Sequence, residues 1–278
     1  MDPLDPYRNA AITQLASLTV LPIWFPFLAK SNRQRAEIFL SKIPNDLSHT
    51  NYFKNRWNYY KGITANLPIQ VLFPIMDFVL NTSLSIIKNT QKRDPNNLEK
   101  MGASYLTGMT SIFIANPVVV TELATQKYRI EPMKAVKRVY REVGIKGFYK
   151  GSSLMAFRNG AFFTSLFFGQ PYMFKEIKAN YPNMNTSQTL LANIVAAVVP
   201  SFIYTTAIAP LDLTVILKQS TPEGNQHSST IQTLKEIYYK HGLKSLKTGL
   251  PMRITACCLE LGWFQFFKQK YEEIADNL

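Results

Sequence analysis

Charged residues are scarce in this 278-residue chain, at 18% against about 25% in a typical soluble domain. The only two cysteines, Cys257 and Cys258, are adjacent and cannot form an ordinary disulfide bridge. The three histidines lie in separate polar loops. The sequence also has no Gly-rich phosphate loop, nucleophile elbow or paired carboxylates. We therefore expect no disulfide scaffold, metal site, cofactor or enzyme activity.

Long uncharged stretches take the place of the missing charges, in a sequence that is 46% apolar and 13% aromatic. A membrane-spanning helix needs about 20 mostly uncharged residues, because its backbone must satisfy its own hydrogen bonds in hydrocarbon. Stretches that meet or nearly meet this requirement are 10–29, 62–87, 101–121, 151–174, 186–217 and 254–267. The mean hydropathy of −0.07 is low for a bundle of apolar spans. A soluble basic helical binding module therefore stays open as an alternative.

The net charge of +13 is concentrated in alternate links between these stretches. Links 30–61, 127–150 and 218–247 carry a large excess of Lys and Arg, whereas 88–100 and 175–186 are shorter and carry less. Basic residues mark one side of a membrane protein. The pattern predicts alternating spans with the three basic links on one side, and it argues against nucleic-acid binding.

The sequence also repeats itself. Residues 137–151 (KRVYREVGIKGFYKG) match residues 235–249 (KEIYYKHGLKSLKTG) at a constant offset of 98. Residues 59–62 (YYKG) match the end of the first of these segments. We expect one domain, 1–278, with three helix-pair repeats at about 8–90, 100–179 and 187–278.

Prolines recur in step with the repeats. Pro26, Pro117 and Pro210 lie toward the end of each odd span, and Gln126 and Gln219 each follow their proline by nine residues. Proline removes a backbone donor and crowds the preceding turn. We expect each proline to kink its helix, so that the kinks help to close one end of the bundle.

With these repeats, prolines and basic links, the chain resembles the mitochondrial carrier family. The resemblance implies an all-α membrane protein with six transmembrane helices in three pseudo-symmetric helix pairs around a central cavity, with short amphipathic loop helices. In the family, aromatic-basic-glycine triplets hold cardiolipin at a helix N-terminus. The matching lipid-binding residues here are Tyr60, Lys61, Gly62, Tyr149, Lys150, Gly151 and Gly249.

The family's gate motif is degenerate in this chain. Odd helices of the family end in Pro-x-Asp/Glu-x-x-Lys/Arg, but the acidic position holds Leu28, Val119 and Asp212, and the basic position holds Ser31, Glu122 and Val215. Asp212 thus has no expected partner. The even-helix motif aligns with Pro171 and Phe174, and with Lys268 and Tyr271, and neither copy can pair as the motif requires. We expect weak closed states and loose coupling between substrate and counter-substrate.

Arg158 is the sharpest candidate for substrate binding, because an arginine two turns into a span is costly unless it faces water or a partner. The family's contact point falls on Arg158 and Asn159, and the corresponding positions are Ala256 and, in the first repeat, Gln70. One fixed cation is expected. Snorkelling of Arg158 to the headgroups is the alternative. For Asp77 and Glu260, a place in the cavity and a structural ion pair are both open.

The expected function is transport of a small anionic metabolite across a membrane by alternating access. The resemblance favours a nucleotide such as ATP or ADP, because the sequence is similar to carrier homologues that intracellular bacteria deliver to host mitochondria. The alternatives are a carboxylate, an amino acid, or a non-transporting scaffold that keeps the fold. The resemblance further implies antiport by a monomer in the inner mitochondrial membrane, here of a host cell after bacterial secretion, with cardiolipin as a lipid partner.

Overall fold

The computed structural model describes residues 6–37, 67, 70–128, 130–220, 232, 235, 238–239, 242 and 249–277. Regular structure within these residues is helical, which confirms the predicted all-α class. The helices of the first two repeats are α1 (Pro6–Glu37), α4 (Leu72–Gln91), α5 (Asn97–Thr110), α6 (Ile112–Tyr128), α7 (Pro132–Val143), η3 (Ile145–Tyr149), α8 (Ser152–Thr164), η4 (Ser165–Gly169) and α9 (Gln170–Asn180). The third repeat contains α10 (Thr186–Ser220) and α13 (Leu250–Asp276).

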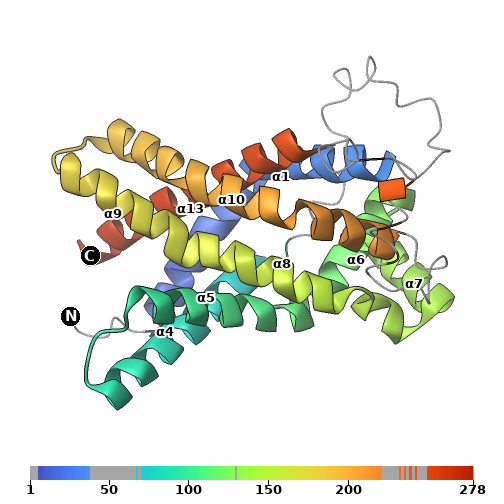
Figure 1. The fold of residues 1–278 in the computed structure, drawn as a ribbon, viewed down its shortest axis with the longest axis horizontal. Helices are drawn as coiled ribbons and strands as arrows, with labels where there is room; N and C mark the ends of the chain where they lie inside the picture. Colours follow the sequence, from blue (N-terminus) through green and yellow to red (C-terminus); the bar gives the residue numbers. More distant parts are fainter. Residues whose placement is uncertain are drawn as a thin grey trace.

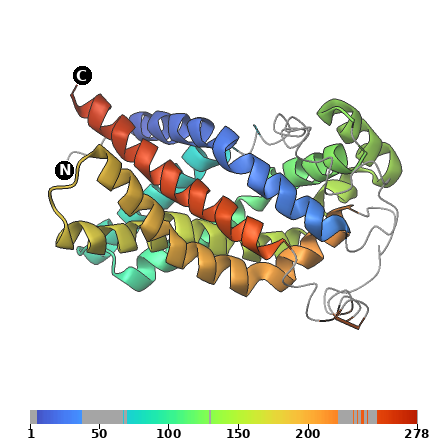
Figure 2. The same ribbon diagram turned by 90° about the horizontal axis from the view of Figure 1, so that it is seen from above.

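The long helices lie side by side along the long axis of the molecule (Figures 1 and 2). Helix α13 packs against both α1 and α10, α5 packs against α8, and α4 contacts α1 and α5. The first and last helices of the chain are therefore neighbours, as closure of a bundle requires. Both termini lie at one end of the bundle and α7 lies at the other (Figure 1).

Length and composition mark the odd helices as membrane spans. Arg8–Ser31 and Thr186–Val215 are each long and apolar enough to cross a membrane, and so is the pair Asn97–Thr110 and Ile112–Thr125 taken together. The even helices α4, α8 to α9, and α13 carry more polar residues and lie alongside them. This agrees with the sequence, in which the odd stretches 10–29 and 101–121 contain no charged residue.

The odd helix of the second repeat is bent by 54° between α5 and α6. The break lies at Ser111, six residues before Pro117. The Ser111 hydroxyl donates to the carbonyl oxygen of Gly108 at 2.7 Å, a local bond that competes with helix geometry. Helices α1 and α10 continue through Pro26 and Pro210 without a break.

Two odd helices begin with the same capping arrangement. The Asn96 side chain accepts from the Glu99 backbone N–H, while the Glu99 carboxylate accepts from the Asn96 N–H. Asn185 and Gln188 form the same reciprocal pair before α10. Each box satisfies two N–H groups that a helix start would otherwise leave unpaired. The second and third repeats thus share their helix starts as well as their sequence.

The segments that match at an offset of 98 residues also share backbone conformation. Gly144 and Gly242 have φ values of 71° and 63°, and Gly151 and Gly249 have 76° and 71°. Glycine adopts these positive φ values without the steric cost that a Cβ atom brings. Gly151 and Gly249 immediately precede α8 and α13, so the same turn starts both even helices.

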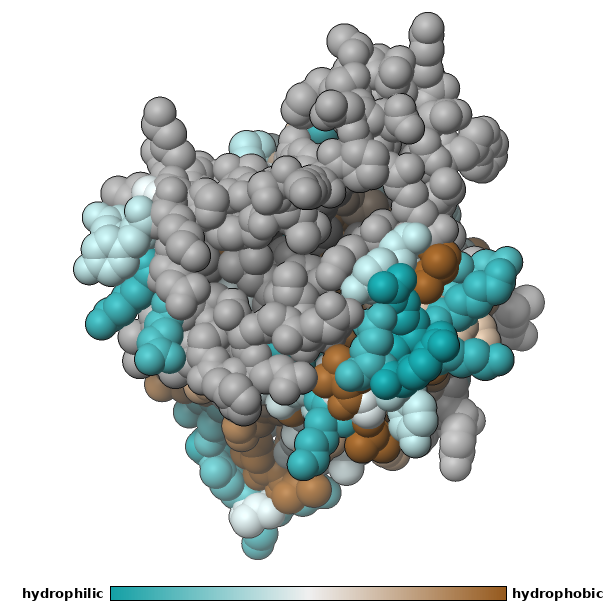
Figure 3. All heavy atoms as spheres, turned by 90° about the vertical axis from the view of Figure 1, so that its right-hand side faces the viewer, coloured by the Kyte–Doolittle hydropathy of each residue, from teal (hydrophilic) through white to brown (hydrophobic). Residues whose placement is uncertain are grey.

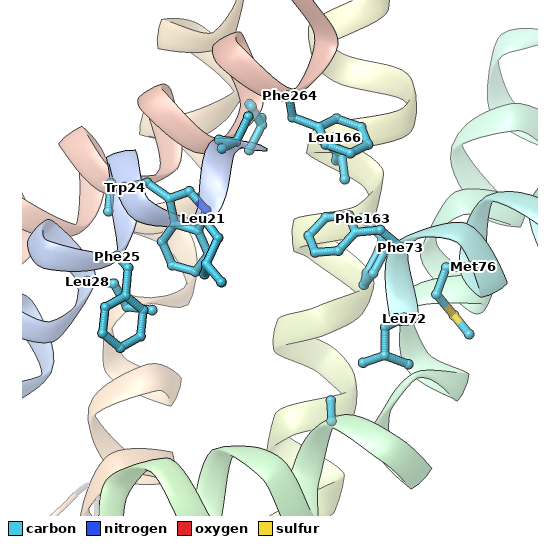
Figure 4. Packing of buried hydrophobic residues seen from close by; sticks show 14 of the residues in the cluster. Leu21, Trp24, Phe25, Leu28, Leu72, Phe73, Met76, Phe163, Leu166 and Phe264 are labelled. Carbon is cyan, nitrogen blue, oxygen red and sulfur yellow. The ribbon is translucent and has the colours of Figure 1, made fainter. Parts of the chain in front are cut away.

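Aromatic side chains fill much of the centre of the bundle. Phe73 of α4 lies beside Phe163 of α8, with ring centroids 5.9 Å apart, and 5.4 Å from Phe264 of α13. Figure 4 shows these rings together with Trp24 of α1. Because the rings come from helices of all three repeats, their burial holds the repeats to one another.

Helix α7 is the amphipathic helix expected in the basic link of the second repeat. Ala135 and Val139 are buried against α6, while Met133 and Tyr140 are more than 60% exposed. At this end of the molecule, hydrophilic and hydrophobic side chains are interspersed over the described surface (Figure 3). A mixed surface of this kind suits the boundary between lipid and water.

Candidate functional site

The central cavity lies between the two ends of the bundle and has a volume of about 90 Å³. Helices α1, α4, α6, α8, α10 and α13 all contribute to its wall. Its charged and polar lining residues are Glu122, Arg158, Asn159, Tyr204, Arg253 and Glu260. Its aromatic lining residues besides Tyr204 are Trp24, Phe73, Phe162 and Phe163. In this conformation the cavity has room for a few water molecules.

Asp212 is the centre of the site's electrostatics. Its Oδ1 lies 3.1 Å from Nε of Arg158 on α8, and its Oδ2 lies 3.6 Å from Nε of Arg253 on α13. All three side chains are largely buried, at 5 to 15% exposure. The expectation that Asp212 has no partner is therefore wrong. In the family, the motif pairs this acid with a basic residue on another odd helix. Here Asp212 lies within ion-pair distance of two arginines on even helices.

Arg253 is a second buried cation, so the expectation of one fixed cation is also wrong. It stands four residues after Gly249, at the position that Met155 occupies in the second repeat. The Met155 sulfur accepts a hydrogen bond from Nη1 of Arg158 at 3.2 Å. The two arginines thus enter from neighbouring repeats and converge on one carboxylate. Such a pair can hold an anionic group in place of Asp212.

The other predicted contact residues fall in different places. Asn159 and Ala256 line the cavity, and the Asn159 amide donates to the Ser111 hydroxyl at 2.7 Å. Asn159 therefore ties α8 to the bend between α5 and α6. Gln70 is buried against α1, where its backbone carbonyl accepts from Ser17, and it is not among the lining residues. Leu72 and Phe73 line the cavity from α4 instead.

On the side of the termini, Asp77 of α4 is paired with Lys268 of α13. The lysine Nζ lies 3.0 and 3.1 Å from the two carboxylate oxygens, and Thr13 of α1 donates to the same carboxylate at 2.9 Å. The even-helix motif predicted no pair involving Lys268. Here the lysine stands at the motif's acidic position and finds its acid on the even helix of another repeat.

On the opposite side, α1 is joined to the start of α13. The Ser31 hydroxyl, at the motif's basic position, donates to the carbonyl oxygen of Gly249 at 2.9 Å. In the second repeat, the Asn116 amide donates to the Phe148 carbonyl at 2.6 Å. Neutral hydrogen bonds therefore connect odd helices to the starts of even helices at this end. They are weaker links than the ion pairs nearer the cavity.

The aromatic-basic-glycine triplet of the second repeat is tied to a kink proline. Pro117 has no N–H for the carbonyl of Phe113, and the Tyr149 hydroxyl donates to that carbonyl at 3.3 Å. Lys150 and Gly151 come next in the sequence and immediately precede α8. Tyr60, Lys61 and Gly62, and the side chains of Gln126 and Gln219, lie outside the described residues.

Comparison with known sequences shows which family this chain belongs to. The sequence model described as mitochondrial carrier protein matches residues 93–181 and 186–276. These two segments cover the second and third helix pairs and more than half of the chain. The chain belongs to the mitochondrial carrier family. It is thus a membrane transporter of the carrier type, as the sequence predicted.

Two relatives from Dictyostelium discoideum show how far the carrier has diverged. It is 28% identical to mitochondrial substrate carrier family protein S over 204 residues, which cover 68% of this chain and 70% of that protein. It is 21% identical to a probable mitochondrial 2-oxodicarboxylate carrier over 260 residues, 89% of this chain and 84% of that protein.

Sequence reasoning missed Arg253 as a site residue, although a signal was available. Arg253, Ala256 and Glu260 are spaced by three and four residues, so they share one face of α13. Ala256 was already expected at the contact point. All three line the cavity.

Proposed function

We propose that this carrier moves a nucleotide across a membrane by alternating access to the central cavity. The supporting observation is that Arg158 and Arg253 converge in a cavity whose wall is rich in aromatic rings. Guanidinium groups bind phosphate oxygens in pairs. Aromatic rings stack on nucleobases whatever the base. One cavity thus offers groups for both ends of a nucleotide.

Binding requires the bundle to open beyond its present shape, because a cavity of about 90 Å³ holds only a few water molecules. Two contact layers stand on either side of the cavity. The Asp77–Lys268 pair lies toward the termini, and the Ser31–Gly249 hydrogen bond lies toward the opposite end. Breaking one layer at a time would expose the cavity to one side at a time.

A 2-oxodicarboxylate is the second candidate, favoured by the relative described as a probable carrier of that class. Two arginines could hold two carboxylates as readily as a chain of phosphates. The aromatic wall would then serve packing alone. A scaffold without transport would keep the same fold and transport neither class of anion.

The test is uptake by purified protein in liposomes, with a panel of nucleotides, dicarboxylates and amino acids. We expect nucleotide uptake by the unaltered carrier. Arg158→Ala removes a charge-assisted contact worth about 1.5 to 3 kcal/mol, so uptake should fall by roughly 10- to 100-fold. Lys134→Ala, at an exposed position on α7, is the matched control and should leave uptake unchanged. Full uptake of every anion by Arg158→Ala refutes the site assignment.

The mode of transport can be tested in the same liposomes, by comparing vesicles with and without internal substrate. On the side of the termini, the described residues form the Asp77–Lys268 pair and a more exposed Arg8–Asp276 pair rather than a ring, so little holds the closed state. We propose antiport with loose coupling, so that vesicles without internal substrate still take up nucleotide. Strict dependence on preloaded substrate would contradict this.

We further propose that the carrier acts as a monomer in the inner mitochondrial membrane, here of a host cell after bacterial secretion, and binds cardiolipin. The start of α8, which has no side-chain cap, brings helix N–H groups together with the cation of Lys150. Gly249 precedes α13 in the same way. Cardiolipin should raise the unfolding temperature of the purified protein, and Lys150→Ala should reduce that increase. Cell fractionation tests the location.

A further inference from the structure

Glu260 is a buried carboxylate that the proposed nucleotide site does not use. It lies on α13, is 9% exposed and lines the central cavity. Among the described residues, no hydrogen bond or ion pair within 4.0 Å reaches its carboxylate, and the cations acting on it are Arg253 and Arg158. Burying an ionised carboxylate without a close partner is costly. The position therefore favours binding of a proton.

The charges around Glu260 leave little room for a further anion. Arg158 of α8 and Arg253 of α13 supply two positive charges, and both are already paired with Asp212 of α10. With Asp212 and Glu260 both ionised, their two negative charges balance the two positive charges of the arginines. A polyanion entering the cavity then meets no net attraction from these four groups.

Among the described residues, the lining of the other helices adds no positive charge. The lining residues from α1 and α4 are apolar: Trp24, Leu28, Leu72 and Phe73. Glu122 of α6, Tyr204 of α10 and Cys257 of α13 are the remaining titratable groups in the wall. None carries a positive charge. Among the groups that line the cavity, protonation of a carboxylate is thus the direct way to leave a net positive charge for the anion.

Glu260 also lies between the two contact layers. Along α13 it is about 10 Å from Arg253 and about 12 Å from Lys268, from a rise of about 1.5 Å per residue. Lys268 is held by Asp77 on the side of the termini. A group at this depth meets water from one side when that layer opens, and from the other side when the opposite layer opens.

We propose that Glu260 binds one proton when the cavity takes up its anion, and that the carrier moves this proton together with the anion. The inference rests on the proposed function, because it assumes a polyanion in the cavity. The proton comes from water on the side of entry and binds a carboxylate oxygen. It returns to water on the side of exit, once the anion has left and Arg253 again attracts the ionised form.

The experiment uses the carrier in liposomes, with the membrane potential held at zero by potassium and valinomycin. The medium is kept at pH about 7 and the lumen at about 8, where nucleotide phosphates are mostly ionised. One proton per anion makes a difference of one pH unit worth about 1.4 kcal/mol, or about tenfold accumulation at equilibrium. The ratio of uptake with and without the gradient is therefore about 10.

Glu260→Gln keeps the shape of the side chain and cannot exchange a proton, so the same ratio should fall to about 1 whatever the absolute rate. Glu273→Gln on the same helix is the matched control, because that residue is exposed and paired with Lys270. It should keep the ratio of the unaltered carrier. A Glu260→Gln variant that also keeps it overturns the assignment to Glu260.

A second measurement needs no variant. A pH-sensitive dye in the lumen should report acidification by one proton for each anion taken up by the unaltered carrier. A ratio of 1 and no acidification overturn proton coupling even if Glu260→Gln does not fold. If nucleotides are not taken up but a dicarboxylate is, with the same response to the gradient, the proposed substrate is wrong and the proton site stands. Uptake of neither class by folded protein overturns both.

Discussion

Replacing Asp212 by asparagine should destabilise the carrier more than any other single change in the cavity. Asp212 is the carboxylate that Arg158 and Arg253 share, at 3.1 and 3.6 Å. Asparagine keeps the size of the side chain and removes its charge. Two buried guanidinium groups are then left without that carboxylate. Breaking a buried pair in this way costs about 3 to 5 kcal/mol.

The size of the interaction can be bounded from the distance. At 3.1 Å the Coulomb attraction is about 5 kcal/mol for an effective dielectric constant of about 20. Desolvation of both groups offsets much of this. In a double-mutant cycle with Arg158→Met we expect a coupling energy of about 1 to 3 kcal/mol. Arg158→Met alone should cost less than Asp212→Asn, because Asp212 keeps Arg253.

The assay is thermal unfolding of the purified protein in detergent, followed by a dye that fluoresces on reaction with thiols. Cys257 is 3% exposed and becomes accessible when α13 unfolds. Lys134→Met is the control, since its pair with Glu131 is exposed and should contribute about 0.5 kcal/mol or less. An Asp212→Asn variant as stable as the unaltered protein refutes the shared ion pair. So does a cycle that is additive within about 0.5 kcal/mol.

Two further predictions concern packing and the layer near the termini. Gly108→Ala should cost about 1 to 3 kcal/mol in the same unfolding assay, because a Cβ there would lie 2.5 Å from the Asn159 carbonyl oxygen. Gly102→Ala on the same helix, with nothing within 4 Å of its Cβ, should be neutral or stabilising by up to about 1 kcal/mol. Lys268→Met breaks the contact with Asp77 and should increase uptake into empty vesicles relative to exchange, measured with the same labelled substrate. An unchanged ratio would mean that this pair does not hold the side of the termini closed.

The repeat architecture was predictable because it depends on local sequence. The turns before α8 and α13 need residues that tolerate positive φ, and glycine supplies this in both copies. These glycines recur at a constant offset of 98 residues, so a comparison of the sequence with itself is enough to find them. The capping boxes at Asn96 and Asn185 are also local, since each joins residues three positions apart, but the sequence analysis did not single them out.

The ion pairs were not predictable from the same comparison. Arg158 and Asp212 are 54 residues apart, and Asp77 and Lys268 are 191 apart. Motif alignment assigns each charge a partner at the corresponding position of the next repeat. Side chains pair instead with the nearest opposite charge across the bundle, and this depends on helix rotation and depth. The motif gave Lys268 no partner, yet Lys268 pairs with Asp77 on the even helix of another repeat.

A degenerate gate motif therefore does not mean that the bundle lacks charged contacts between its helices. Here Asp212 occupies a gate position by sequence and pairs with arginines of the cavity wall. Under the proposed function, an anion that binds those arginines competes with Asp212, so substrate entry and release of a contact between α8, α10 and α13 would be one event. In a ring of pairs separate from the binding site, substrate acts on the gate only through helix movement. In this carrier the same two guanidinium groups would sense the substrate and hold the helices together, which links occupancy to opening without the missing motif residues.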